Sequence, residues 1–194
     1  MTAHNWITLC CAIFLTAYSI PKSKRKHFLV IAAFLASCIG DAFLANRNHQ
    51  EARFAAGIAG FSIAHFMLFF HAWKQGKNWN WETVVILGSA YTTFYAFALL
   101  PAMHSKVISL AVAIYTLLSI ATLATAVGMK SACATKSFYI VGIALLVFSD
   151  TLIALQEFLH WTRANPLIIP TYVLSHLSIL LSCLLEPRKS ERML

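Results

Sequence analysis

The chain has 194 residues, of which 59% are hydrophobic and 11% are charged, and its mean hydropathy is +0.71. Soluble domains carry about 25% charged residues, so this composition excludes an ordinary soluble protein. The net charge of +8 does not predict nucleic-acid binding, because the basic residues lie between long apolar runs, as in membrane proteins. These runs lack the alternation of a transmembrane β-barrel. We therefore predict an all-α, polytopic transmembrane helical bundle, with residues 1–194 as a single domain.

In chain order, seven apolar runs approach the roughly 20 residues that cross a bilayer as a helix. The first run is the shortest. Basic residues follow this run rather than precede it, so we expect a retained helix and not a cleaved signal peptide. The predicted helices cover residues 5–20, 27–45, 53–73, 82–100, 105–127, 137–158 and 167–185.

Lysine and arginine are distributed unevenly between the two ends of these helices. Of the 15 such residues, 11 lie in the first, third and fifth loops and the C-terminal tail. Cytoplasmic loops carry this excess, so we predict an outside N-terminus and a cytoplasmic C-terminus. We expect an integral protein of the bacterial inner membrane, or of the endoplasmic reticulum in a eukaryote. The last helix contains no lysine, which argues against a retinal-binding protein.

Two acidic residues lie within predicted membrane helices, Asp41 in the second and Asp150 in the sixth. A carboxylate near the bilayer centre costs about 2.5–3.5 kcal/mol on insertion scales, so such residues usually serve a function. An interhelical hydrogen bond is the structural alternative. The two helices run in the same direction, and each aspartate lies roughly 20 Å from the cytoplasmic end of its helix, at about 1.5 Å per residue. Because their depths agree, we predict that they form one site.

Polar side chains on two further helices complete this predicted site. His65 lies in the third helix, and His176 lies in the seventh, with Tyr172 one turn earlier on the same face. No H-x-x-x-H or E-x-x-H pair lies on one helix, and the five cysteines form no C-x-x-C pair. We therefore expect no metal and no other cofactor. The order of Asp and then His in both halves of the chain is compatible with two parallel repeats.

Four short motifs lie in order around these residues. Residues 37–44 (SCIGDAFL) fit the pattern S-x-x-G-D-x-x-L, and an Ala-His pair follows at His65. Gly142 and residues 148–154 (FSDTLIA) fit G-x(5-6)-[IVF]-S-D-x-x-[IL]-A. Residues 171–176 begin like T-Y-Y-x-A-Q but end with histidine in place of glutamine. Together these motifs resemble those of the YhhN family, the membrane lysoplasmalogenases.

The resemblance implies hydrolysis of the vinyl-ether bond of a lysoplasmalogen, which releases a fatty aldehyde and glycerophosphoethanolamine or glycerophosphocholine. It also implies that Asp41 and Asp150 are the catalytic pair. The expected partners are then a lysophospholipid substrate and the lipid bilayer, with no nucleic acid and no obligate protein partner. Before the G-D motif, the chain has one helix fewer than the eight-helix animal members of the family.

Vinyl-ether hydrolysis needs a proton donor, and then a group that stabilises a cation and activates water. We predict that Asp150 donates the proton and that the Asp41 carboxylate performs the second role. Asp→Asn at either position should then lower kcat at least about a hundredfold. The side chains expected to orient the substrate or water are His65, Tyr172, His176 and Ser149. The side chains expected to meet a phosphate head group at the outer end are Asn46, Arg47, Arg53 and Arg163.

The alternative is a non-enzymatic protein, a proton-coupled transporter or a lipid-binding protein that uses the same aspartates. Transporters often contain helices broken by glycine or proline near the midplane of the membrane. Here the glycines are scattered, and no proline lies at the centre of a predicted helix. We therefore favour the hydrolase, and incubation with an alkenyl lysolipid distinguishes the two functions.

Overall fold

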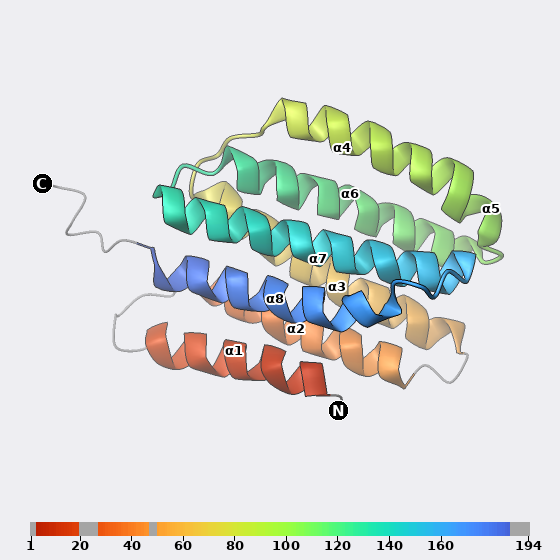
Figure 1. The fold of residues 1–194 in the computed structure, drawn as a ribbon, viewed down its shortest axis with the longest axis horizontal. Helices are drawn as coiled ribbons and strands as arrows, with labels where there is room; N and C mark the ends of the chain where they lie inside the picture. Colours follow the sequence, from red (N-terminus) through yellow and green to blue (C-terminus); the bar gives the residue numbers. More distant parts are fainter. Residues whose placement is uncertain (1–2, 20–26, 47–49, 187–194) are drawn as a thin grey trace, which may run out of the picture.

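The computed structural model describes residues 3–19, 27–46 and 50–186, which form seven helical rods and contain no strand (Figure 1). The predicted all-α fold is confirmed, and every predicted helix is present to within four residues at each end. One rod is composite, because α4, the π-helical turn η3 and α5 follow one another without a break. The elements are α1 (Ala3–Ser19), α2 (Phe28–Ala45), α3 (Glu51–Lys74), α4 (Trp81–Phe94), η3 (Tyr95–Leu99), α5 (Leu100–Ala102), α6 (Lys106–Gly128), α7 (Cys133–Leu159) and α8 (Asn165–Leu184).

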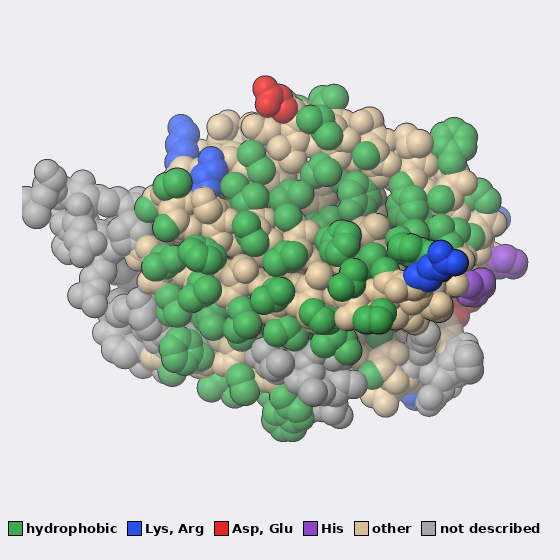
Figure 2. Space-filling view, in the orientation of Figure 1, with side chains coloured by type: hydrophobic (Ala, Val, Ile, Leu, Met, Phe, Trp, Pro, Cys, Tyr) green, Lys and Arg blue, Asp and Glu red, His purple; other side chains and the backbone are tan. Residues whose placement is uncertain are grey.

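Six of the seven rods are long and apolar enough to cross a membrane. The remaining one, α1, has 17 residues, which is the lower limit for a bilayer of ordinary thickness. The surface in Figure 2 is covered mainly by hydrophobic side chains, with most of the charged side chains near its edges. A surface of this kind is stable in lipid and not in water, so the protein is an integral membrane protein. The orientation of the termini stays a prediction.

Six helices form a closed ring, and one helix lies outside it. Around the ring, α1 packs on α2, α2 on α3, α3 on α6, α6 on α7, α7 on α8, and α8 back on α1. The remaining helix, α4, packs on the outer side of α6 (Figure 1). None of the 14 residues of α4 is buried, in contrast to α3 and α7, which supply much of the core. The described interior is therefore the centre of the ring, and α4 is an added outer wall.

Glycines let two pairs of ring helices approach closely. A Cβ atom on Gly60 of α3 would lie 2.8 Å from the Cα of Gly40 in α2, so these backbones touch. A Cβ atom on Gly142 of α7 would lie 2.9 Å from the carbonyl oxygen of Ser175 in α8. Small residues at such contacts are the usual means of packing helices in a membrane. Gly40 precedes Asp41, so the contact between Gly40 and Gly60 fixes the position of Asp41 where α2 packs on α3.

Two prolines interrupt regular hydrogen bonding inside helical rods. Pro101 lies in α5, immediately beyond the predicted helix end, and the π-helical turn precedes it. Proline cannot donate a hydrogen bond and clashes with the carbonyl four residues earlier, here Phe97, which accounts for the widened turn. Pro170 lies inside α8, in its second turn, so the prolines are not confined to helix ends. The carbonyl oxygen of Ile168 in this turn accepts a hydrogen bond from the hydroxyl of Ser149, at 3.0 Å.

Candidate active site

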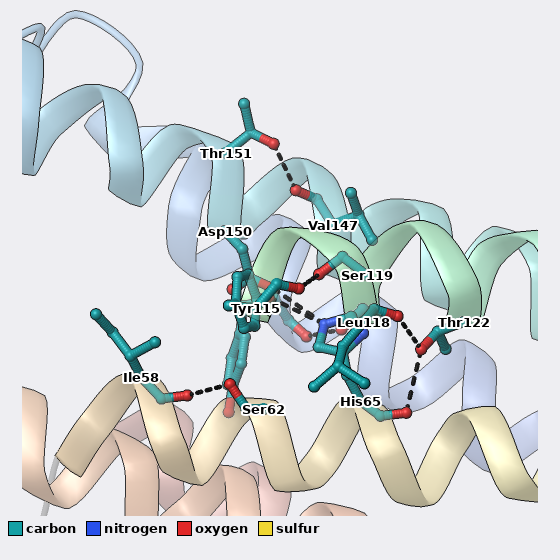
Figure 3. Close-up of polar contacts among 12 residues, drawn as sticks. Ile58, Ser62, His65, Tyr115, Leu118, Ser119, Thr122, Val147, Asp150 and Thr151 are labelled. Carbon is teal, nitrogen blue, oxygen red and sulfur yellow. Dashed lines mark hydrogen bonds and ion pairs between the residues drawn. The ribbon is translucent and has the colours of Figure 1, made fainter. Parts of the chain in front are cut away.

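Asp150 is held by two side chains from two other helices. The hydroxyl of Tyr115 in α6 donates a hydrogen bond to Oδ2 of Asp150 in α7. The same hydroxyl lies 3.0 Å from Nε2 of His65 in α3, and that nitrogen lies 3.5 Å from Oδ2 of Asp150. Figure 3 shows the three side chains converging between α3, α6 and α7. The aspartate, tyrosine and histidine therefore form one connected polar group within the bundle.

The hydrogen-bond pattern indicates where the imidazole of His65 carries its hydrogen. A tyrosine hydroxyl has one hydrogen, and here it points to Asp150, so Nε2 of His65 must donate to the tyrosine oxygen. His65 is only 1% exposed, and its Nδ1 atom has no hydrogen-bond partner. An unprotonated Nδ1 carries no unsatisfied donor, which agrees with this tautomer. His65 thus donates to Tyr115, and Tyr115 donates to Asp150, which makes a hydrogen-bond relay that ends on the carboxyl oxygen.

Neighbouring hydroxyl groups fix the helix segments that carry Tyr115 and His65. Ser119 donates to the carbonyl oxygen of Tyr115 at 2.9 Å, one turn further along α6. Thr122 donates to the carbonyl oxygen of His65 at 3.1 Å and so joins α6 to α3 (Figure 3). These contacts hold α3 and α6 in register at the level of the aspartate.

A cavity opens beside Asp150 between α3, α6, α7 and the α4–η3 wall. Its volume is about 80 Å³, and it is only partly enclosed. Its walls are mainly apolar and aromatic, and its ionisable side chains are Asp150, Glu157, Tyr91, Tyr95 and Tyr115. An apolar lining with one carboxyl group suits a hydrocarbon-bearing ligand whose reactive polar group meets Asp150.

A second, more polar pocket continues from the first at the end of the bundle where α3 and α6 begin. The two share Phe54, Glu157 and Phe158, so they are adjacent. The polar residues that line the second pocket are Gln50, Glu51, His104, Ser105 and Glu157. A polar pocket at the bundle end therefore adjoins an apolar cavity that Asp150 borders.

Asp41 lies in a separate setting inside the ring. Its Oδ2 atom accepts a hydrogen bond of 2.8 Å from the hydroxyl of Tyr172 in α8. His176 packs against Tyr172, with ring centroids 4.5 Å apart, and against Phe34 at 4.9 Å. Phe61 stands edge-on to Tyr172 at 6.4 Å and also lines the cavity, so it belongs to the wall between the two regions. Of the five residues predicted to share one cavity, only Asp150 lines the cavity described here.

The aspartate in each half of the chain contacts a residue of the other half. Asp41 and His65 belong to the first half, and Asp150 and His176 to the second, but Asp150 contacts His65 and Asp41 contacts α8. Phe61 contacts Tyr172, the partner of Asp41, and lines the cavity that Asp150 borders. The aspartates thus form two neighbouring hydrogen-bonded groups that share the wall at Phe61.

The remaining predicted site residues lie away from the cavity lining. Ser149 is fully buried and bonds to α8, on a different side of α7 from Asp150. Arg53 donates to the carbonyl oxygen of Asn46 at 2.6 Å, and neither residue lines either pocket. Arg163 is exposed and outside both linings, and Arg47 falls outside the described residues.

Tyr115 is the main residue that sequence reasoning missed. One signal was present, because Tyr115, Ser119 and Thr122 recur at spacings of four and three and therefore share a face of α6. A polar stripe on an apolar helix points toward the bundle interior. Among the described residues, no group of three His, Cys, Asp or Glu side chains is arranged to hold a metal ion.

Comparison with known proteins gives a family and no individual relative. No curated protein and no solved structure matches the chain. A family model, described as the YhhN family, matches residues 4–183, which is nearly the whole chain. The matched region includes both aspartates, the Tyr115–His65 pair and all the residues that line the cavity. The chain belongs to the YhhN family.

Proposed function

We propose that the protein is a membrane-embedded hydrolase that cleaves the vinyl-ether bond of lysoplasmalogens. The observation that carries the proposal is the setting of Asp150, a carboxyl group at the inner end of an apolar cavity within membrane-spanning helices. Tyr115 already donates a hydrogen bond to this carboxyl group, and His65 donates to Tyr115. Membership of the YhhN family is compatible with a membrane hydrolase.

In the first step, Asp150 transfers its proton to the alkenyl carbon that is not bonded to the ether oxygen. The electrons of the double bond form the new C–H bond, and the carbon beside oxygen becomes an oxocarbenium cation. Negative charge develops on Asp150 as the proton leaves. Tyr115 already donates to its Oδ2 atom, and His65 donates to the Tyr115 oxygen and polarises that hydroxyl, so the pair stabilises this charge without reorganising, as preorganised donors do.

In the second step, the new Asp150 carboxylate faces the cation across the cavity and stabilises it. A water molecule attacks the cationic carbon, and the carboxylate accepts the proton that the water releases. The hemiacetal then breaks its bond to the glycerol oxygen, which takes up the hydroxyl proton and leaves an aldehyde. Asp150 regains its proton in this cycle, so one carboxyl group acts first as acid and then as base, as in retaining glycosidases.

In this scheme Asp41 is a positioning residue. The wall that includes Phe61 separates it from the cavity. The second pocket accommodates the head group, with Gln50 and His104 as donors to the phosphate and Glu51 and Glu157 facing the ammonium group, and the apolar cavity accommodates the start of the alkenyl chain. The substrate is then a single-chain ether lysophospholipid. The membrane is the bacterial inner membrane, or the endoplasmic reticulum in a eukaryote.

The test is turnover by the purified protein in detergent. Alkenyl lysolipids with ethanolamine or choline head groups are incubated with the native chain and with Asp150→Asn, and the aldehyde is quantified by mass spectrometry. The proposal expects aldehyde from the native chain only. Absence of turnover with both head groups in a folded protein contradicts the proposal and favours the proton-coupled transporter or lipid-binding function instead.

A further inference from the structure

The outer wall of the cavity is formed by the one rod outside the ring. Tyr91 and Phe94 of α4, and Tyr95 and Leu99 of η3, line the cavity. The rod packs mainly on α6, and its closest approach to the α7 backbone is through η3. Over the length of α4, the cavity is therefore closed toward the bilayer by side chains and not by packed backbones.

One hydrogen bond crosses the seam between α4 and α7. The hydroxyl of Tyr91 lies 2.8 Å from the hydroxyl of Thr151, the residue after Asp150. On α7, Thr151 stands between the side that carries Asp150 and Ala154, which line the cavity, and the side that carries Phe148, which is 46% exposed. The hydrogen bond thus lies at the boundary between the cavity and the lipid-facing surface. Figure 2 shows that hydrophobic side chains cover most of the surface on the face where α4 and α7 lie.

Among the described residues, packed side chains occupy the interior of the ring next to Asp150. Tyr115 and the fully buried His65 fill the space behind the carboxyl group, and Ile143 and Leu146 of α7 pack in the core below it. The cavity is nevertheless only partly enclosed. It adjoins the polar pocket at the bundle end, which suits a head group, and the apolar seam between α4 and α7.

We propose that the seam between α4 and α7 is a lateral opening through which the hydrocarbon chain of the substrate extends from Asp150 into the bilayer. The Tyr91–Thr151 hydrogen bond spans this opening when no chain occupies it and breaks to admit one. The inference rests on the proposed function for the identity of the lipid. It assigns the seam to an unbranched alkyl or alkenyl chain, because only an apolar ligand gains by lying between these walls and the lipid.

The first experiment varies chain length. A chain that leaves through the seam ends in lipid, so kcat/KM should change less than about threefold from decenyl to octadecenyl lysolipids, beyond the carbons that contact the protein. A closed site would instead show a sharp fall above one length, and such a fall in the native protein overturns the opening. Mixed micelles of constant composition keep substrate presentation equal across the series.

The second experiment narrows the seam. Thr151→Trp should lower kcat/KM for the octadecenyl substrate at least about tenfold more than for a butenyl substrate, because only the longer chain reaches the seam. Val141→Trp is the matched control, because valine has the shape of threonine and Val141 is 49% exposed on the same helix without lining the cavity. An equal loss for both chain lengths in Thr151→Trp contradicts the proposal. If that variant does not fold, the chain-length series still decides.

A third measurement does not depend on hydrolysis. A saturated alkyl lysolipid with a diazirine at its chain end should label lipid-facing residues of α4 and α7, identified by peptide mass spectrometry. Labelling confined to core residues of the ring, such as Phe34 or Ile143, overturns the lateral opening even if turnover is observed. Absence of turnover together with labelling at the seam refutes the hydrolase and leaves the opening supported.

Discussion

The regions around Asp150 and Asp41 have similar components but different surroundings. Each aspartate lies in an apolar helix and accepts a hydrogen bond from a tyrosine of another helix. Their exposure is also nearly equal, 8% for Asp41 and 9% for the Asp150 side chain. Asp150, however, borders a cavity and ends a hydrogen-bond relay from His65, whereas Asp41 is enclosed by packed helices and aromatic rings.

Under the proposed function, this difference assigns the reaction to Asp150 and a supporting role to Asp41. A proton donor must reach the atom that it protonates, so only the carboxyl group that borders the cavity meets the geometric requirement for general acid catalysis. The enclosed carboxyl group can act through its charge or through the position of α2 and α8. The comparison thus predicts a larger loss of kcat for Asp150→Asn than for Asp41→Asn, although the two substitutions look equivalent in the sequence.

The largest effect is expected for Asp150→Asn. The amide has no proton of suitable acidity, so kcat should fall at least about a hundredfold, the usual scale for a general acid–base group. Aldehyde release measures the rate, and circular dichroism with size-exclusion chromatography checks the fold. Turnover within a few-fold of native would exclude Asp150 as the proton donor.

Tyr115→Phe should have the next largest effect. It removes the hydrogen bond to Asp150 that stabilises the developing carboxylate, and hydrogen bonds to charged groups contribute about 1.5–3 kcal/mol, or roughly 10- to 100-fold in kcat. KM should stay nearly constant, because the hydroxyl acts on the acid and not on the lipid.

Tyr139→Phe is the matched control for this substitution. Tyr139 is a fully buried tyrosine of α7, and its hydroxyl donates to the carbonyl oxygen of Leu68 at 2.7 Å, away from the cavity. This variant should lose stability while retaining kcat. Equal losses of kcat in the two variants would mean that Tyr115 matters only for folding.

Asp41→Asn should lower kcat by about tenfold or less, since the enclosed carboxyl group acts only indirectly on the reaction. Tyr172→Phe breaks the same hydrogen bond from the other side and should give a similar or smaller loss. The same aldehyde assay ranks both against Asp150→Asn. If Asp41→Asn loses as much as Asp150→Asn, the two-carboxylate mechanism expected from the sequence is restored.

Gly60→Ala should have the smallest effect on kcat and the clearest effect on stability. Its Cβ atom would lie 2.8 Å from the Cα of Gly40, so α2 and α3 must separate. Overpacking of this kind costs about 1–3 kcal/mol. The thermal midpoint in detergent should therefore fall by several degrees, at about 2–4 °C per kcal/mol. Gly88→Ala, whose Cβ would meet nothing within 4 Å, should leave the midpoint unchanged or raise it.

The sequence alone predicted the number of helices and their bounds. It also identified the two aspartates whose carboxylates are costly to place in lipid. Continuous apolar runs specify membrane helices because backbone groups in lipid must bond within their own segment. The cost of a carboxylate in lipid depends on residue type and depth, so Asp41 and Asp150 could be singled out without a structure. The motif resemblance predicted the family that the matched residues 4–183 confirm.

Only the tertiary structure decided which helices face one another. Periodicity shows which residues share a face of one helix, but it carries no information about the neighbour on which that face packs. For this reason the pairing of Asp150 with Tyr115 and His65 could not be derived from spacing, and neither could the separation of Asp41 from the cavity. The position of α4 outside the ring, which leaves a cavity behind it, likewise depends on tertiary packing. All seven helices are apolar, and the sequence does not show which six of them pack around the centre.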